Sequence, residues 1–224
     1  MALADWEVIM GGGLVLNTQY RVSGNKSLSQ EFDKGATHIV HMNTYNDAPK
    51  NVEVRTWMSV LQSDVGVYEY LIGAISRKQQ GADTYFYWCL FIDVNADGSI
   101  DAVKAQAGYY LQGGQYATVD TDITDTYKSQ INDYWYEGKW RFVKMVGYES
   151  AGKYHVTIEM TTDIDTPDVN NPPIDMLVGI FSADIDIPEE LQNGGACGLV
   201  VGGTDISQNN TMGAPLYDYT QLYY

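Results

Sequence analysis

The chain has 224 residues, of which 45% are hydrophobic and 19% are charged, and this balance excludes an intrinsically disordered protein. A formal net charge of −16 argues against binding to nucleic acid or to anionic membrane surfaces, because so acidic a surface would be repelled by both. A chain of this length can bury a full hydrophobic core, and we expect residues 1–224 to form a single domain.

The sequence shows neither a secretory signal nor a membrane span. The first residues, MALADWEVIMGGG, lack the basic region and sustained apolar run that a secretory signal requires. The longest apolar run, YFYWCLFI at residues 85–92, is too short to cross a bilayer. We therefore expect a soluble protein with no signal peptide and no membrane insertion.

Alternating apolar and polar residues predict β-strands along most of the chain. In residues 154–160 (YHVTIEM) every second residue is apolar, as in a strand with one buried face, and residues 52–60 (VEVRTWMSV) nearly repeat this pattern. Further strands are expected, in chain order, at residues 14–22, 37–45, 67–75, 84–93, 99–107, 140–148, 176–183 and 197–203. Clusters rich in Gly, Ser and Asn separate them, as turns do.

Helices are expected only as short segments, at residues 46–51 and 188–193 and within residues 125–135. No segment has a sustained 3.6-residue period, so the fold class is predicted to be all-β. Because alternation gives each strand one apolar face that must be covered, the strands are expected to form two packed antiparallel sheets, an antiparallel β-sandwich. Residues 163–173, rich in Pro, Asn and Asp, are predicted to form a long surface loop.

The sequence DVNADGSID at residues 93–101 has two interpretations. Possible oxygen ligands alternate along it, as they do in a calcium-binding loop. They are the side chains of Asp93, Asn95, Asp97 and Asp101 and the backbone carbonyl of Ser99. However, Lys104 stands where such a loop needs a bidentate Glu, and the flanking segments are strand-like. The alternative is a β-hairpin turn, in which Asp and Asn serve turn chemistry and Gly98 supplies a positive φ. Any bound calcium would be structural.

Tyrosine is unusually frequent, with 18 Tyr against five Phe, and it suits half-wet surfaces where sugars or protein partners dock. The strand at residues 85–92 is apolar on both faces. One face is expected to meet the opposite sheet, and the other either lines a concave, sugar-stacking surface or is covered by loops. Two groups of candidate ligand-binding residues follow: Tyr85, Tyr87 and Trp88 in this strand, and Tyr134, Trp135 and Tyr136 near a predicted loop, where they contact a partner or close the sandwich edge.

The cysteines and histidines have no metal-site spacing. Cys89 is expected to be a buried apolar residue, with a disulfide to Cys197 as the alternative. His38 and His41 lie three residues apart in a predicted strand, where alternation sends them to opposite faces, so they are not expected to hold a metal together.

Five stretches carry a family resemblance when they are taken in chain order. They are GNKSL at residues 24–28, the hairpin with its Asp/Asn/Gly turn, residues 138–160, GLV at residues 198–200 and YDYTQLYY at residues 217–224. In that order they resemble the concanavalin A-like lectin and glucanase superfamily, including its laminin-G-like branch. The resemblance implies a jelly roll. It leaves function open, because the superfamily includes lectins, carbohydrate-binding modules, glycoside hydrolases and non-catalytic modules of adhesins and virus particles.

The glucanase branch implies catalytic carboxylates on one strand, and the nearest match here is DIDIPE at residues 184–189. Asp184 replaces the expected Glu, which shortens the reach of the carboxylate, and Pro188 removes a backbone donor that a central strand needs. A solvated acidic loop is therefore the favoured interpretation of this segment, and no enzyme is expected.

The sequence therefore predicts a non-catalytic sandwich that serves as a structural or attachment component of a virus particle or surface assembly. Such a component would bind neighbouring protein subunits and glycans, with structural calcium if the hairpin turn holds a metal. The alternatives are a free carbohydrate-binding module or lectin and, less favoured, a divergent glycoside hydrolase.

Overall fold

The computed structural model describes the backbone of residues 6–10, 14–17, 27–30, 37–42, 49–60, 68–136, 138–205 and 215–223. Side chains are described for residues 49–60, 69–114, 119–136, 138–200, 221 and 223. The predictions for the side chains of His38 and His41, and for a helix at residues 46–48, lie outside this range.

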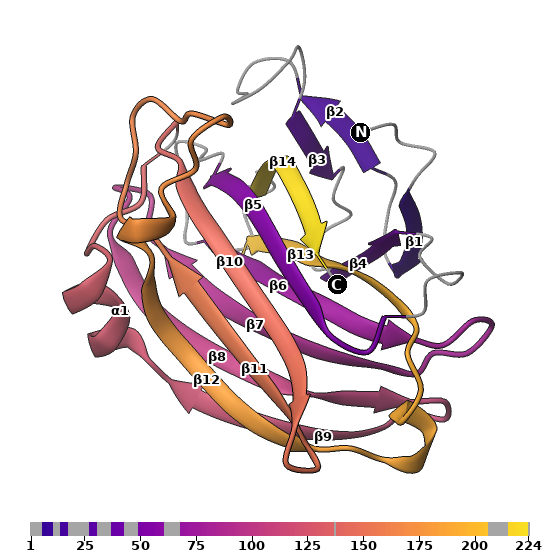
Figure 1. Cartoon of the computed structure of the whole chain (residues 1–224). Coiled ribbons are helices and arrows are strands. Elements are labelled where there is room, and N and C mark those ends of the chain that lie inside the picture. The colour runs from indigo at the N-terminus through magenta and orange to yellow at the C-terminus, as the bar shows by residue number, and fades with distance from the viewer. Residues whose placement is uncertain are drawn as a thin grey trace.

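Within the described residues, fourteen strands form two antiparallel sheets of seven strands each. The first sheet contains, in spatial order, β1 (Trp6–Met10), β4 (Thr37–Met42), β13 (Ala196–Asp205), β6 (Tyr68–Lys78), β7 (Tyr85–Val94), β8 (Ile100–Leu111) and β9 (Gln115–Asp122). The second contains β12 (Val178–Asp186), β11 (Lys153–Met160), β10 (Arg141–Ser150), β5 (Val52–Val60), β14 (Pro215–Tyr223), β3 (Ser27–Gln30) and β2 (Leu14–Asn17). In Figure 1, β5, β10, β11 and β12 lie in front of β6 to β9, so the two sheets form a sandwich. The all-β prediction is confirmed.

The main core fills the space between the two sheets, and it is built by the alternation that the sequence shows. On β11, Tyr154, Val156 and Ile158 are fully buried, whereas the residues between them are half-buried. On β7, Phe86 and Trp88 enter the same cluster. Gly147 on β10 makes room for this packing, because a Cβ atom there would lie 2.5 Å from the Tyr154 hydroxyl and 2.9 Å from the Trp88 ring.

Part of the outer face of the second sheet is also buried, because a loop covers it. Trp57 on β5 and Phe142 on β10 point away from the main core and pack with Trp140, with ring centroids of Trp57 and Phe142 5.2 Å apart. Ile164, near the start of the long loop predicted at residues 163–173, and Leu177, which follows it, pack against this cluster. The loop thus explains why β5 is buried on both faces at this end.

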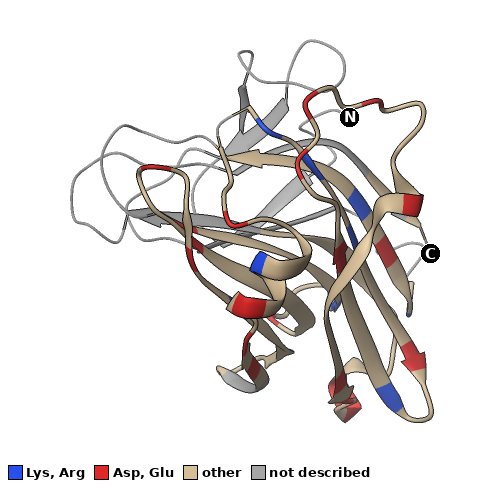
Figure 2. Ribbon diagram, turned by 90° about the vertical axis from the view of Figure 1, so that its left-hand side faces the viewer, with Lys and Arg blue, Asp and Glu red and all other residues tan. Residues whose placement is uncertain are grey.

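The rest of the outer face of the second sheet carries ion pairs. Lys144 pairs with Glu159 at 2.9 Å, His155 contacts Asp184 at 2.6 Å, and Lys153 pairs with Asp186. Figure 2 shows acidic and basic positions next to one another along these strands. The interpretation of residues 184–186 as a loop is wrong, because their backbone pairs with β11 as the end of β12. Glu159 and Asp186 thus gain lysine partners across the strands, and Asp184 gains a histidine contact.

The outer face of the first sheet has an apolar centre, which we call the outer cluster. It consists of buried Leu71, Ile75, Tyr85, Cys89 and Val200, with partly buried Tyr87, Phe91 and Tyr110 packed against them. Gly73 lies in the middle of β6, where a Cβ atom would be only 2.4 Å from the Cys89 Cβ and the Trp88 carbonyl oxygen. Close approach of β6 and β7 therefore requires a glycine at this position.

The helices are short, as predicted. α1 (Thr124–Gln130) overlaps the expected region 125–135 and begins one residue before it, and the 3₁₀ helix η3 (Glu189–Leu191) follows Pro188. A second 3₁₀ helix, η2 (Ile174–Met176), was not predicted, and Pro49–Asn51 are not helical. Among the described residues, no helix has both the length and the apolar character needed to cross a membrane. The single domain spanning residues 1–224 stays a prediction.

Candidate functional site

The acidic segment forms the turn of a β-hairpin between β7 and β8. The Asn95 amide donates to the Ser99 carbonyl at 2.8 Å, and the Gly98 amide donates to the Asn95 carbonyl at 2.8 Å. Gly98 has a φ of 84°, a conformation that only glycine adopts without strain. The hairpin prediction is therefore confirmed, with the tip where the sequence placed it.

Side chains of the turn bond mainly to one another. Asp97 Oδ1 accepts hydrogen bonds from the Ser99 amide at 2.9 Å and from the Ser99 hydroxyl at 2.6 Å, and Asn95 Nδ2 donates to Ser99 Oγ at 3.0 Å. Both Ser99 bonds lower the pKa of Asp97, because they stabilise the charged carboxylate. These contacts are the Asp and Asn turn chemistry that the β-hairpin interpretation of the sequence predicts.

Asp93 and Asp101 lie outside this internal network. Asp93 is directly opposite Glu69 of β6 in the strand register. Burial, followed by repulsion from Glu69, raises the pKa of Asp93 to about 6, with a smaller contribution from Asp101. Asp93 Oδ1 is buried and has no hydrogen-bond partner. Among the described residues no group of three or more His, Cys, Asp or Glu side chains is arranged to hold a metal ion, and calcium binding stays a prediction.

The second predicted cluster, at residues 134–136, lies against this turn. Ser99 and Tyr134 form an antiparallel bridge. The Ile100 amide donates to the Asp133 carbonyl at 2.7 Å, and the Trp135 amide donates to the Gly98 carbonyl at 2.8 Å. Two segments that are separated in sequence by a strand hairpin and a helix thus form one surface feature, which we call the tyrosine–turn site: Asn95, Asp97, Ser99, Tyr134 and Tyr136.

Tyr134 and Tyr136 form an exposed stacked pair. Their side chains are 41% and 43% exposed, their ring centroids are 5.5 Å apart, and the ring planes differ by 6°. Trp135 between them points inward and is fully buried, with its indole nitrogen donating to the Lys139 carbonyl at 3.2 Å. The extended backbone of this segment therefore places alternate residues on opposite sides, with both tyrosines outside.

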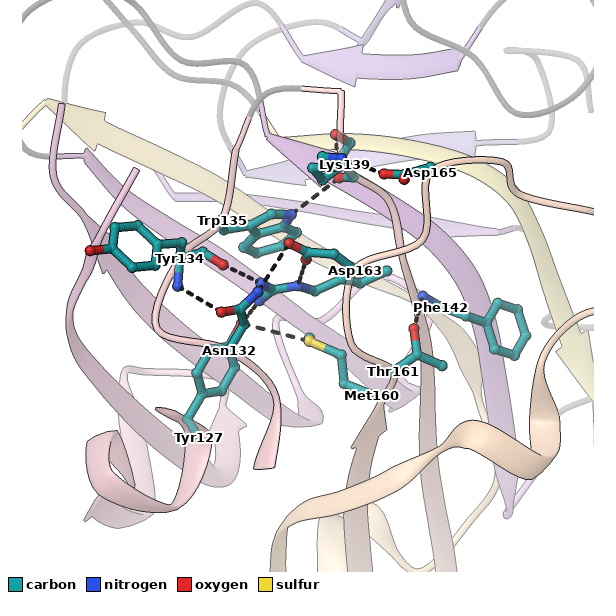
Figure 3. A network of polar contacts seen from close by, with 12 residues as sticks. Tyr127, Asn132, Tyr134, Trp135, Lys139, Phe142, Met160, Thr161, Asp163 and Asp165 are labelled. Carbon is teal, nitrogen blue, oxygen red and sulfur yellow. Dashed lines mark hydrogen bonds and ion pairs between the residues drawn. The ribbon is translucent and has the colours of Figure 1, made fainter. Parts of the chain in front are cut away.

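A buried arginine anchors the tyrosine segment (Figure 3). Arg141 Nη2 donates to the Tyr134 carbonyl at 2.7 Å, and Arg141 Nε pairs with Asp163 Oδ1 at 2.6 Å. The guanidinium group also lies over the Trp135 ring, 4.4 Å from its centroid, and donates to the Tyr127 hydroxyl. Its charge is compensated by these contacts, which is the condition for burying an arginine.

Sequence reasoning missed Arg141 and Asp163 as parts of the site. The available signal was the parity of β10, because Arg141 shares the inward side with Val143 and Met145 and a charge there requires a buried partner. Nothing in the sequence identified Asp163 as that partner. A second bond holds the same segment, since Asn132 Oδ1 accepts from the Tyr134 amide at 3.3 Å.

The other aromatic candidates lie in the interior. Trp88 and Trp135 are fully buried, and Tyr85 is 4% exposed in the outer cluster, where it stacks on Tyr110 with centroids 5.7 Å apart. Burial raises the pKa of Tyr85 to about 12. We therefore withdraw Trp88, Trp135 and Tyr85 as ligand contacts, because a surface ligand cannot reach them. Tyr87 is half-buried and is not part of the tyrosine–turn site.

The two cysteines do not form a disulfide. Cys89 belongs to the outer cluster of the first sheet, whereas Cys197 belongs to the core between the sheets. The two side chains therefore lie on opposite faces of the same sheet, which excludes the disulfide alternative. Burial raises the pKa of the Cys89 thiol, so this group stays protonated.

No protein-family model matches the chain, and no curated protein sequence matches it. Among solved structures, a legume lectin-like domain from Entamoeba histolytica matches with a TM-score of 0.52 and 9% identity, over 99% of this chain and 90% of that one. A carbohydrate esterase from Shiga toxin-encoding bacteriophage phi24B matches with a TM-score of 0.47 and 12% identity, over 99% and 91% of the two chains. The binding domain of botulinum neurotoxin serotype D/C matches at 0.43 and 11%, over 97% of this chain and 44% of that one.

The chain thus spans less than half the length of the neurotoxin binding domains that it matches. At such low identity these likenesses concern the fold alone. The chain has the concanavalin A-like jelly-roll fold that the five short stretches indicated.

Proposed function

We propose that this chain is a non-catalytic carbohydrate-binding module that contacts its ligand through Tyr134 and Tyr136. The observation that carries the proposal is the exposed, parallel tyrosine pair on a segment held in place by the buried Arg141. Aromatic rings stack on the apolar faces of sugars, and their hydroxyl groups hydrogen-bond to sugar hydroxyls. Anchoring reduces the entropy lost on binding.

The neighbouring turn supplies the polar part of the site. The Asp97 carboxylate is exposed, and both of its intramolecular bonds use the Oδ1 atom. Oδ2 therefore serves as an acceptor for a ligand hydroxyl. An aromatic platform beside a few fixed polar groups is the usual composition of a small-ligand site. The lectin-like neighbour has the same fold, and its name is a reason to test sugars first.

The non-catalytic part of the proposal is supported by the surroundings of the acidic segment on β12. Asp184 contacts His155 and Asp186 pairs with Lys153, and these carboxylates are 64% and 83% exposed. Both carboxylates are solvated and already have partners on the neighbouring strand, whereas the two carboxyl groups of a glycoside hydrolase flank the scissile bond of the bound sugar. The glycoside hydrolase alternative predicts release of reducing sugar that Asp186→Asn abolishes, and such a result would contradict the proposal.

Binding is tested by screening the wild-type chain on a glycan array and measuring the affinity for the strongest ligand by calorimetry. Tyr134→Ala and Tyr136→Ala should each weaken binding by about 1 to 3 kcal/mol, the value of one aromatic stacking contact in comparable ring recognition. Tyr148→Ala is the matched control, because Tyr148 is 39% exposed and also contacts a ring, that of His155, but lies at the other end of β10. Equal affinities of the wild type and all three variants for the ligand would contradict the proposal.

A structural or attachment role in a virus particle or surface assembly, with protein neighbours, stays a prediction. Light scattering coupled to a sizing column separates it from a free module. Sugar binding by a monomer supports the module, whereas self-assembly without sugar binding supports the structural role.

A further inference from the structure

Several hydrogen-bond donors at and beside the tyrosine–turn site are engaged in bonds within the protein. Asn95 Nδ2 donates to Ser99 Oγ, and the Ser99 hydroxyl donates to Asp97 Oδ1. Beside the tyrosines, Asn132 Nδ2 donates to Asp163 Oδ2 at 3.3 Å. Carboxylates have no hydrogen to donate when ionised, so Asp97 offers only acceptor atoms. The tyrosine hydroxyls can both donate and accept.

The same surface is rich in negative charge. The segments 93–101 and 132–136 contain four acidic residues and no Lys, Arg or His. They are Asp93, Asp97, Asp101 and Asp133. Figure 2 shows acidic positions on loops and strand ends of the described ribbon, so the local charge adds to an acidic whole.

Cations close to the site are already paired. Arg141 is buried against Asp163, and Lys139 pairs with Asp165. Lys104 lies on β8 opposite Phe91, and its charge partly offsets the repulsion at Asp93. An anionic ligand at the tyrosine pair would therefore meet like charges without a dedicated basic partner.

On the premise of the proposed glycan-binding function, we infer that the site takes uncharged glycans through their hydroxyl donors and rejects glycans that bear carboxylate or sulfate groups. Hydroxyl groups match an acceptor-rich surface, because each donates to a carboxylate oxygen. A carboxylate or sulfate offers only acceptors, so it leaves acceptor facing acceptor and adds repulsion between like charges.

The test uses pairs of probes with the same linkage that differ at C6, where a CH2OH group is replaced by a carboxylate: cellohexaose, mannohexaose and β-1,4-linked galactohexaose, each with its C6-oxidised uronate form. Calorimetry is run at low salt and at about 0.5 M NaCl, where the screening length falls below the spacing of these charges. The neutral member of a binding pair should bind at least about tenfold more tightly than the uronate at low salt, and the gap should narrow at high salt.

A double variant tests whether the local carboxylates cause the selectivity. Asp101→Asn with Asp133→Asn should reduce the difference between neutral and uronate probes severalfold. The control, Glu189→Gln with Glu190→Gln, removes the same amount of charge far from the site. These residues precede Leu191, whose carbonyl accepts a hydrogen bond from Arg77. Arg77 also bonds to Glu149, which lies at the opposite end of β10 from Arg141. It should leave the difference unchanged.

The outcomes separate this inference from the function on which it rests. Uronate probes that bind as tightly as their neutral counterparts, through a site that Tyr134→Ala destroys, would overturn the inference and keep the glycan-binding function. If both Tyr134→Ala and Tyr136→Ala bind every probe as tightly as the wild type does, the function and the inference are overturned together. The same follows if the wild type binds neither the probes nor any glycan of the wider array.

Discussion

The two aromatic clusters expected from the sequence, around Tyr85 on β7 and around Tyr134 before β10, have opposite surroundings. Tyr85 belongs to the outer cluster, where Leu71, Ile75 and Cys89 pack beside it. Tyr134 stands on the surface beside Tyr136, and the groups that hold it in place bind its backbone rather than its ring. Similar composition therefore serves stability in one place and leaves exposed rings in the other.

The largest expected effect concerns the anchor of the tyrosine segment. Arg141→Met leaves the Asp163 carboxylate, the Tyr127 hydroxyl and the Tyr134 carbonyl without their partner. Breaking a buried ion pair of this kind should lower the free energy of unfolding by about 3 to 5 kcal/mol, measured by urea denaturation. Lys144→Met is the control, because the half-buried Lys144–Glu159 pair should contribute less than about 1 kcal/mol. Equal losses in the two variants would show that Arg141 is not an anchor.

Truncating one tyrosine in each cluster tests the comparison directly. Tyr85→Ala opens a cavity in the outer cluster and should cost about 3 kcal/mol of stability. Tyr134→Ala removes an exposed ring and should cost less than about 1 kcal/mol while it abolishes most glycan binding. The free energies of unfolding of both variants, measured by chemical denaturation, test this difference. A large stability loss in Tyr134→Ala would mean that the pair is a structural plug.

Gly73 tests how tightly β6 and β7 pack beneath the outer cluster. In Gly73→Ala the new methyl group would overlap the Cys89 Cβ and the Trp88 carbonyl, so β6 and β7 must move apart. Overpacking of this kind should cost about 1 to 3 kcal/mol. The matched control is Gly179→Ala on β12, where no atom lies within 4 Å of the new Cβ. Melting curves of the two variants should therefore differ clearly, and indistinguishable curves would refute the close approach.

A smaller effect is expected from Asp93, which borders both regions. Its folded pKa, about 6, lies above the ordinary value of 3.8. The folded state thus favours the protonated form, so the contribution of Asp93 to stability is present below pH 4 and is lost as the pH rises to about 6. Asp93→Asn should consequently be more stable than the wild type at pH 7, by up to about 1 kcal/mol after solvent screening, with the difference fading towards pH 4.

Asp122 provides a control of opposite sign. Hydrogen bonds from the Thr124 amide and hydroxyl lower the pKa of Asp122, so its contribution to stability is present above the ordinary carboxyl pKa and is lost as the pH falls. Asp122→Asn should therefore be less stable than the wild type at pH 7. Stability measured between pH 3 and 7 should give diverging curves for the two variants, and a common direction would contradict the assignment of Asp93.

The features that sequence predicted well depend on local chemistry. Alternation over residues 154–160 specified β11 because each residue needs only its own position in the strand, and Gly98 specified the hairpin tip because the turn requires a positive φ. The turn at Ala151 and Gly152, both with positive φ, is similar. Such signals lie within a few neighbouring residues, and tertiary contacts do not override them.

The features that sequence missed depend on contacts between distant segments. The burial of β5 on both faces, with Trp57 on the outer one, needs the loop that packs through Ile164 and Leu177. The acidic turn meets Tyr134 only because the chain returns after α1. The pairing of Arg141 with Asp163 spans 22 residues. A pattern of residue types identifies which groups need partners, but the register of the two sheets decides which partner each one finds.

The smallest effect concerns the hairpin turn and separates its two sequence interpretations. Asp97→Ala removes both bonds to Ser99 and should lower the melting temperature slightly, because the turn loses its internal acceptor.

The turn interpretation, which these bonds favour, predicts the same melting temperature for the wild type with and without calcium. The calcium interpretation predicts that calcium raises the melting temperature and that Asp93→Ala removes this rise. Because Ser99 forms the bridge to Tyr134, a change at the turn should also weaken glycan binding, which a turn independent of the site would not do.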